Sequence, residues 1–138
     1  MMVLGPAPNK GKKIIMVSMV YKKIELENNQ TLIISDLSRE ISADGYVVIM
    51  KANIEINIEK ELFFEAPLSD FKFEDILATL GDKVIYEYKI ERNFIMSKEK
   101  DRVFETLVKT YLDNLGQYVA KPKFPGKFIL KEYKDRIK

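Results

Sequence analysis

Residues 50 to 58 alternate strictly between apolar and polar side chains, and this pattern constrains the fold most. The apolar positions are Met50, Ala52, Ile54, Ile56 and Ile58. The positions between them are Lys51, Asn53, Glu55 and Asn57. Successive side chains of a strand point to opposite faces, so one face of this strand is dry and the other wet. Such a strand is typical of an antiparallel sheet that covers a core with one face.

Other segments also have the period of a strand. The apolar stretch from Ile14 to Leu26 and the segment Thr31 to Ser35 flank an asparagine-containing turn, which predicts a hairpin. Residues 84 to 91 alternate again, and a final strand is predicted over Lys127 to Tyr133.

Two segments have helical spacing. The first is short, begins near Ser69 or Asp70, and ends at Gly81. The second is long: it follows Ser97, and apolar residues recur from position 104 to 119 before Pro122 stops it. The sequence therefore predicts an α+β fold, with an antiparallel sheet of four to five strands and two helices packed on one face.

Residues 1 to 13 contain prolines, glycines and three lysines without hydrophobic periodicity, so we expect a flexible basic tail and a single domain over residues 14 to 138. The apolar run after the tail is shorter than the about 18 residues of a membrane span. Lys22 and Lys23 follow it where a signal peptide would have a small-residue cleavage site. We therefore expect a cytoplasmic protein with no membrane partner.

The chain has no histidine and no cysteine. Imidazole bases, thiol nucleophiles and the common zinc ligands are thus excluded, and no cofactor is expected. The net charge of +2 conceals an uneven distribution. Residues 1 to 23 and 121 to 138 each carry +5, and the middle carries −8. The basic ends either fold onto the acidic middle or bind an anionic partner.

The polar segment 35 to 45 is the first candidate site. Its candidate ligand-binding residues are Asp36, Ser38, Arg39 and Asp44. Carboxylates are ligands for Mg²⁺ and an arginine fork can hold a phosphate. A structural interpretation competes with this one, because aspartate and serine form turns and Arg39 can pair with Asp44 or Glu91.

A second candidate cluster ends the strand that begins near residue 84. It consists of Glu91, Arg92 and Asn93. Arg92 and Asn93 could recognise a carboxylate or phosphate together with Arg39, if the two segments are neighbours. Asn93 could instead simply form the turn into the following helix.

Basic and aromatic residues alternate near the C-terminus, a composition that suits single-stranded nucleic acid. If Phe128 and Leu130 face the core, the exposed candidates are Lys127, Lys131, Tyr133 and Lys134. Three consecutive apolar residues, Leu62 to Phe64, could pair with a second copy of the chain or close the end of the core.

The chain resembles an uncharacterised family of small bacterial proteins. The residues that carry the resemblance are Leu32, Asp36, Ser38, Arg39, Ala43, Asp44, Val48, Arg92, Asn93, Phe94, Phe124, Pro125 and Lys127. The resemblance covers residues 20 to 133 and implies a compact bacterial intracellular domain without an assigned activity.

Three functions follow from these patterns. The first is a non-catalytic binding or regulatory module, which could form a homodimer and whose ligand is an unknown protein or small molecule. The second is single-stranded nucleic-acid binding through the basic termini. The third is a Mg²⁺-dependent phosphoester enzyme that uses Asp36, Asp44, Glu91 and Arg39.

Overall fold

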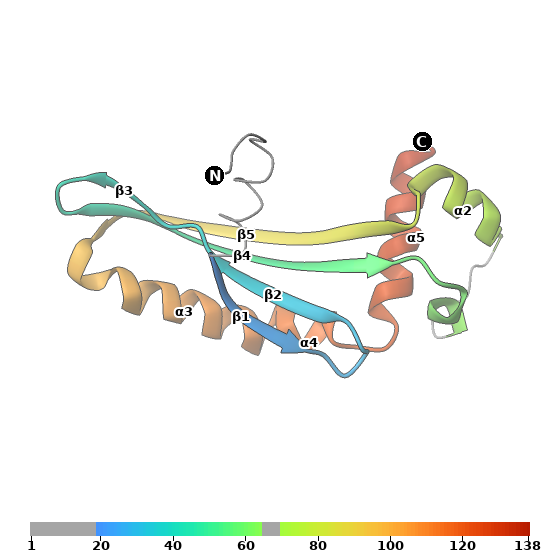
Figure 1. Ribbon diagram of the computed structural model, residues 1–138, viewed down its shortest axis with the longest axis horizontal. Coiled ribbons are helices and arrows are strands. Elements are labelled where there is room, and N and C mark those ends of the chain that lie inside the picture. The colour runs from blue at the N-terminus through green and yellow to red at the C-terminus, as the bar shows by residue number, and fades with distance from the viewer. Residues whose placement is uncertain (1–18, 65–69) are drawn as a thin grey trace, which may run out of the picture.

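The computed structural model describes residues 19 to 64 and 70 to 138, and the α+β class is confirmed (Figure 1). The strands are β1 (Val20–Glu25), β2 (Thr31–Asp36), β3 (Arg39–Ser42), β4 (Gly45–Asn57) and β5 (Lys83–Met96). The α-helices are α2 (Phe73–Leu80), α3 (Lys100–Asp113), α4 (Leu115–Val119) and α5 (Phe124–Arg136). Two short 3-10 helices are η1 (Lys60–Phe64) and η2 (Ser97–Glu99). The predicted tail, residues 1 to 13, lies outside the described residues.

The five strands form one antiparallel sheet around β4. On one side β4 pairs with β3 near its start and with β2 further along, and β1 follows β2. On the other side β4 pairs with β5 from Gly45 to Asn57. Figure 1 shows β4 and β5 as two long neighbouring ribbons that extend over most of the length of the molecule.

The alternation that predicted the central strand is confirmed in β4. The five apolar residues from Met50 to Ile58 are all buried, whereas Glu55 and Asn57 on the other face are exposed. The predicted hairpin is also present as β1 and β2, with Asn29 in the left-handed conformation at its turn, whereas the predicted start of its first arm, residues 14 to 18, lies outside the described residues. This conformation is one that asparagine adopts more readily than most residues.

The helix α3 runs along β4 and β5 and buries one stripe against them (Figure 1). The buried residues of α3 are Phe104, Leu107, Val108 and Tyr111. The long predicted helix is interrupted at Asn114, and the short helix α4 begins at Leu115. A side chain at Gly116 would lie 3.3 Å from Leu112, so glycine allows the close packing of α3 and α4.

The final strand predicted over Lys127 to Tyr133 is wrong, because this segment belongs to the helix α5. Pro125 stands in the first turn of α5, a position that proline favours in helices. Ile129 and Tyr133 lie four residues apart and are both buried. The segment therefore joins the core with the period of a helix, although its short length also allowed an alternating interpretation.

The predicted short helix is confirmed as α2, which ends at Gly81 with a positive φ of 86°. The helix begins at Phe73 with Lys72 at its N-cap position, so the predicted start at Asp70 is wrong, and the alternative start, Ser69, lies outside the described residues. Sheet and helices share one hydrophobic core. Among the described residues, no helix combines the length and apolar character that crossing a membrane requires.

Candidate functional site

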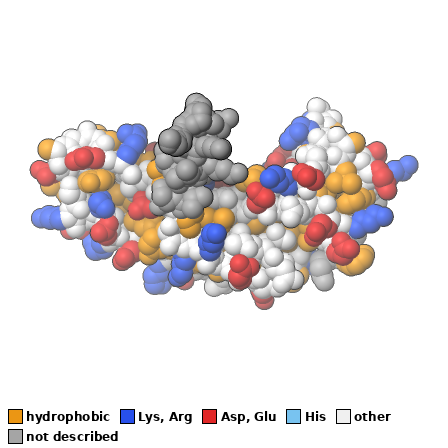
Figure 2. Space-filling model, viewed as in Figure 1, with side chains coloured by type: hydrophobic (Ala, Val, Ile, Leu, Met, Phe, Trp, Pro, Cys, Tyr) orange, Lys and Arg blue, Asp and Glu red, His pale blue; other side chains and the backbone are white. Residues whose placement is uncertain are grey.

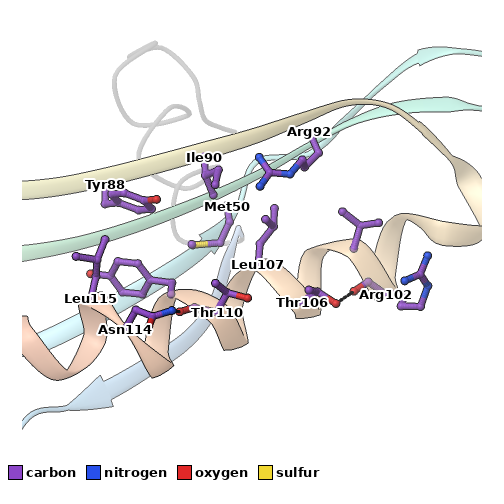
Figure 3. A pocket seen from close by; sticks show the side chains of 12 residues that line it. Met50, Tyr88, Ile90, Arg92, Arg102, Thr106, Leu107, Thr110, Asn114 and Leu115 are labelled. Atoms are coloured by element: carbon purple, nitrogen blue, oxygen red, sulfur yellow. Dashed lines mark hydrogen bonds between the residues drawn. The ribbon is translucent and has the colours of Figure 1, made fainter.

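A groove with a volume of about 300 Å³ lies between the sheet and α3 (Figure 3). The strands contribute Met50, Tyr88, Ile90 and Arg92. The helix α3 and the start of α4 contribute Arg102, Val103, Thr106, Leu107, Thr110, Tyr111, Asn114 and Leu115. The groove exists because α3 lies along the strands, and the side chains that face one another across it do not fill the space between them.

The floor of the groove is apolar. Met50 is fully buried, and Leu107 and Tyr111 are 7% and 4% exposed. The ring of Tyr88 packs against that of Tyr111 with centroids 5.2 Å apart. Burial and a hydrogen bond with Tyr86 raise the pKa of Tyr111 well above its usual range, so this phenol is protonated at neutral pH. The floor therefore provides contact area without charge.

Two arginines stand toward one end of the groove, on opposite walls (Figure 3). Arg92 pairs in register with the buried Val48, which places its side chain on the helix-covered face of the sheet. Its Nη1 atom donates a hydrogen bond of 3.0 Å to the carbonyl oxygen of Glu91. Arg102 projects from the first turn of α3 and forms an ion pair with Glu99. Both guanidinium groups are exposed, so an anion can reach them from solvent.

Polar groups of α3 form the rim of the groove. The hydroxyl of Thr106 donates to the carbonyl oxygen of Arg102 at 2.9 Å, and the Asn114 amide donates to that of Thr110 at 2.9 Å. Arg102, Thr106, Thr110 and Asn114 follow one another at intervals of four residues. These four residues were not predicted as site residues, although a polar stripe beside the apolar stripe of the same helix was a signal that could have found them.

The residues predicted in segment 35 to 45 have mainly structural contacts. One carboxylate oxygen of Asp36 accepts a hydrogen bond of 3.0 Å from the backbone N–H of Ser38. The Ser38 hydroxyl accepts one of 3.0 Å from the N–H of Ile49. These bonds form the turn that leads from β2 to β3. Asp44 is exposed, and its carbonyl oxygen accepts a bond of 2.8 Å from the N–H of Ser97.

The sheet separates the predicted residues onto two faces. Asp36 pairs with Met50 and thus shares the helix-covered face with Arg92. Glu91 pairs with Ile49, and Arg39 with Val47, which places both on the opposite face. Within the described residues no group of three or more acidic side chains could hold a metal ion. The ion pairs found in residues 19 to 64 and 70 to 138 do not include one between Arg39 and Glu91.

Asn93 does not form the turn into the helix, because β5 continues to Met96. The register between β4 and β5 shifts between Tyr46 and Val48, so that Asn93 and Phe94 together lie opposite Val47. Phe94 has a positive φ of 57° and is 83% exposed. This β-bulge is a local irregularity of a long strand, and Asn93 contributes to it through the backbone.

The predicted nucleic-acid residues lie on α5. Lys127, Lys131 and Lys134 are exposed along one side of the helix. Tyr133 differs from the expectation: it is 7% exposed, and its ring packs edge-on against Phe71 at 5.1 Å. A helix turns the side chain of Tyr133 into the core, where it cannot stack on a base, whereas the predicted strand would have left it exposed.

The aromatic residue that borders the lysines is Tyr118 of α4, which was not predicted as a site residue. It is 52% exposed and lines a groove of about 300 Å³. The other residues of this groove are Lys121, Pro122, Lys123, Phe124 and Lys127. A second groove, of about 350 Å³, continues along α5 from the same Lys127.

The apolar cluster of residues 62 to 64 divides between core and solvent. Phe63 is 7% exposed and Leu62 packs against the core, whereas Phe64 is 80% exposed. Two of the three residues thus close the end of the core. Self-association stays a prediction. Light scattering of the full chain would measure the oligomeric state and test it.

The comparisons with known proteins identify no relative: no family model, no curated protein and no solved structure matches the chain. The groove between β5 and α3 and the lysines of α5 are therefore interpreted from their own chemistry.

Proposed function

We propose that the protein is a cytoplasmic, non-catalytic binding module that takes a small amphipathic anion into the groove between β5 and α3. A carboxylate or phosphate would bind Arg92, and an apolar body would lie on Met50, Ile90 and Leu107. The observation that carries the proposal is the position of two exposed arginines at one end of a groove with a buried apolar floor. We also propose that the protein is a member of the family of small bacterial proteins that its sequence resembles.

The shape of the groove supports a small ligand. Its volume of about 300 Å³ matches the lower end of the range for small-molecule sites, roughly 300 to 1,000 Å³. An arginine presents a planar fork that can bind a carboxylate or phosphate through two parallel hydrogen bonds. Arg92 is available for such a contact, since its Nη1 atom bonds only to the neighbouring carbonyl oxygen of Glu91 among the described groups. Apolar contact with the floor would add affinity in proportion to the area buried.

The titratable groups of the groove favour binding over acid–base chemistry. Among the described residues that line it, the ionisable side chains are Arg92, Arg102, Tyr88 and Tyr111. Arginines remain charged at neutral pH, and the raised pKa of Tyr111 keeps its phenol neutral. A general acid or base works best when its pKa lies near the operating pH. Arginine and a buried tyrosine do not meet this condition.

A fluorescent amphipathic anion tests the proposal directly. Anilinonaphthalene sulfonate should bind the folded protein saturably, and octanoate should displace it while the uncharged octanol should not. We expect Arg92→Gln to weaken binding by about 10- to 100-fold, the usual loss for a hydrogen bond to a charged group. The matched control is Arg39→Gln, because Arg39 is an exposed arginine on the opposite face of the sheet. Equal weakening by both substitutions would contradict the proposal.

The location of the ligand needs a separate variant. Thr110 lines the groove and is exposed, so Thr110→Phe should fill part of the groove without disturbing the core. We expect this variant to unfold at an unchanged urea concentration and to lose the fluorescent anion. Unchanged binding by folded Thr110→Phe would place the anion elsewhere.

A further inference from the structure

We propose that the protein has a second binding site, for single-stranded nucleic acid, on the surface formed by the end of α4 and the exposed side of α5. We call this surface the lysine face. Its residues are Tyr118, Lys121, Lys123, Lys127, Lys131 and Lys134. None of them lines the groove between β5 and α3, so the two sites are independent.

Two grooves lie along the lysine face. The groove beside Tyr118 and the groove along α5 are both lined by Lys127. In α5, Lys127, Lys131 and Lys134 follow at intervals of four and three residues, which is about 4.5 to 6 Å along a helix axis. Regularly spaced ammonium groups of this kind can follow the phosphates of an extended strand.

Among the described residues, no ion pair joins the lysine face to the acidic middle of the chain. Within the described residues, the one ion pair of segment 121 to 138 joins Lys131 to Asp135, both in α5, at 3.1 Å. On the face of the molecule drawn in Figure 2, acidic and basic side chains are interspersed. The seven basic and two acidic residues of segment 121 to 138 thus remain a local positive charge. Such a charge attracts a polyanion.

Tyr118 favours a single strand over a duplex. Its ring is half exposed, and the buried Phe124 contacts it edge-on at a centroid distance of 5.4 Å. This contact holds the ring in place beside a groove of about 300 Å³. An unpaired base can stack on an exposed tyrosine, whereas the bases of a duplex are already stacked on one another.

The connection that carries the first lysines is anchored to the sheet. The side-chain amide of Asn28, in the turn between β1 and β2, donates to the carbonyl oxygens of Val119 and Lys121 at 2.8 and 2.9 Å. These bonds join residues 91 and 93 positions apart in the sequence. They hold the segment between α4 and α5 in one conformation, so that Lys121 and Lys123 stay beside Tyr118.

Fluorescence anisotropy with a labelled oligothymidylate of about 12 nucleotides tests this site in the full-length chain. We expect binding at low salt that weakens as salt rises, with a logarithmic slope of about −0.7 for each phosphate contact. Tyr118→Leu should lower the affinity by about 5- to 100-fold, the loss that one stacked base would cause, and should leave the salt slope unchanged. Tyr118→Phe keeps the ring and should bind like the unmodified protein.

A matched pair of lysines separates the lysine face from general surface charge. Lys131 and Lys109 are both exposed on helices, and each pairs with an aspartate four residues later, at 3.1 and 2.7 Å. We expect Lys131→Gln to reduce the salt slope by about 0.7 and to weaken binding. Lys109→Gln should change neither.

Five results would overturn the proposal. Four of them are no binding at low salt, equally tight binding of a duplex of the same length, equal weakening by Lys109→Gln and Lys131→Gln, and unchanged affinity of a folded Tyr118→Leu variant. The fifth is binding of polyglutamate as tight as that of the oligothymidylate, since it would assign the face to acidic proteins. Arg92→Gln should leave oligothymidylate binding unchanged, so failure of the groove proposal would leave this one standing.

Discussion

The phenol oxygens of Tyr86 and Tyr111 lie 3.1 Å apart and form a hydrogen bond between β5 and α3. Tyr111 is 4% exposed, and Tyr86 is half buried. The ring of Tyr86 also packs edge-on against Phe124 at 5.4 Å. This pair therefore joins the sheet to α3 and α5 beside the proposed ligand groove, which Tyr111 lines.

The Tyr86–Tyr111 pair should make the protein sensitive to alkaline pH. Burial raises the pKa of both phenols in the folded state above the value of about 10 of a free tyrosine. Below about pH 9 both states are protonated, and the contribution of the pair to stability is complete. Above about pH 10 the unfolded chain loses these protons first, so the free energy of unfolding falls as pH rises.

Urea unfolding at several pH values measures this effect. Tyr111→Phe removes one of the two phenols, so its stability should fall less steeply above about pH 10 than that of the unmodified protein. At neutral pH the same substitution should cost about 0.5 to 1.5 kcal/mol, the usual contribution of one hydrogen bond. Parallel alkaline curves for the two proteins would contradict the assignment.

Asn28 should contribute more to stability than its place in a turn suggests. Its amide donates to two carbonyl oxygens near the end of α4, and its Oδ1 atom accepts from the N–H of Gln30 at 3.1 Å. We expect Asn28→Ala to lower the free energy of unfolding by about 1 to 3 kcal/mol, because it leaves the carbonyl oxygen of the buried Val119 without this donor. Asn57→Ala, at an exposed position, is the control and should change it by less than about 0.5 kcal/mol.

The two faces of β4 should respond differently to alanine. Ile54 is fully buried, and Ile54→Ala should cost about 2 to 5 kcal/mol through lost burial and the cavity that remains. Glu55 is exposed on the opposite face, where it pairs with Lys83 at 3.5 Å. Glu55→Ala should cost at most about 1 kcal/mol. Calorimetric or urea unfolding of the two variants compares the faces, and similar costs would contradict the assigned orientation of β4.

Phe94 should be replaceable by glycine without loss of stability. Its φ of 57° lies in the left-handed region, which costs a residue with a side chain roughly 1 to 2 kcal/mol. Glycine adopts this conformation freely, and Phe94 is 83% exposed, so little packing is lost. Phe94→Gly should therefore be more stable than Phe94→Ala, which keeps the strain. Urea midpoints decide the order, and a Phe94→Ala variant at least as stable as Phe94→Gly would contradict the strain assigned to this position.

Arg92 was predicted as a binding residue because it stands at the end of a strand beside polar neighbours. Arg39, with which it was expected to act, lies on the other face of the sheet, as does Glu91 of the same predicted cluster. Which face a residue occupies depends on strand register, and a shift of one residue exchanges the faces. Register results from pairing between distant segments, so the local pattern of residues 35 to 45 could not show it. Arg102 and Tyr118 were missed for a related reason, since their roles depend on what their helices pack against.

The sequence alone determined the class of the fold, the central strand β4 and the helices α2 and α3. Their periods of two and 3.6 residues are local properties that a single segment displays. Only the tertiary structure decided that residues 127 to 133 form a helix, because that segment fits either period and the burial of Ile129 and Tyr133 selects one. The tertiary structure also decided the sites. A groove lined by β5 and α3, and a lysine face formed by α4 and α5, exist only when separate segments lie together.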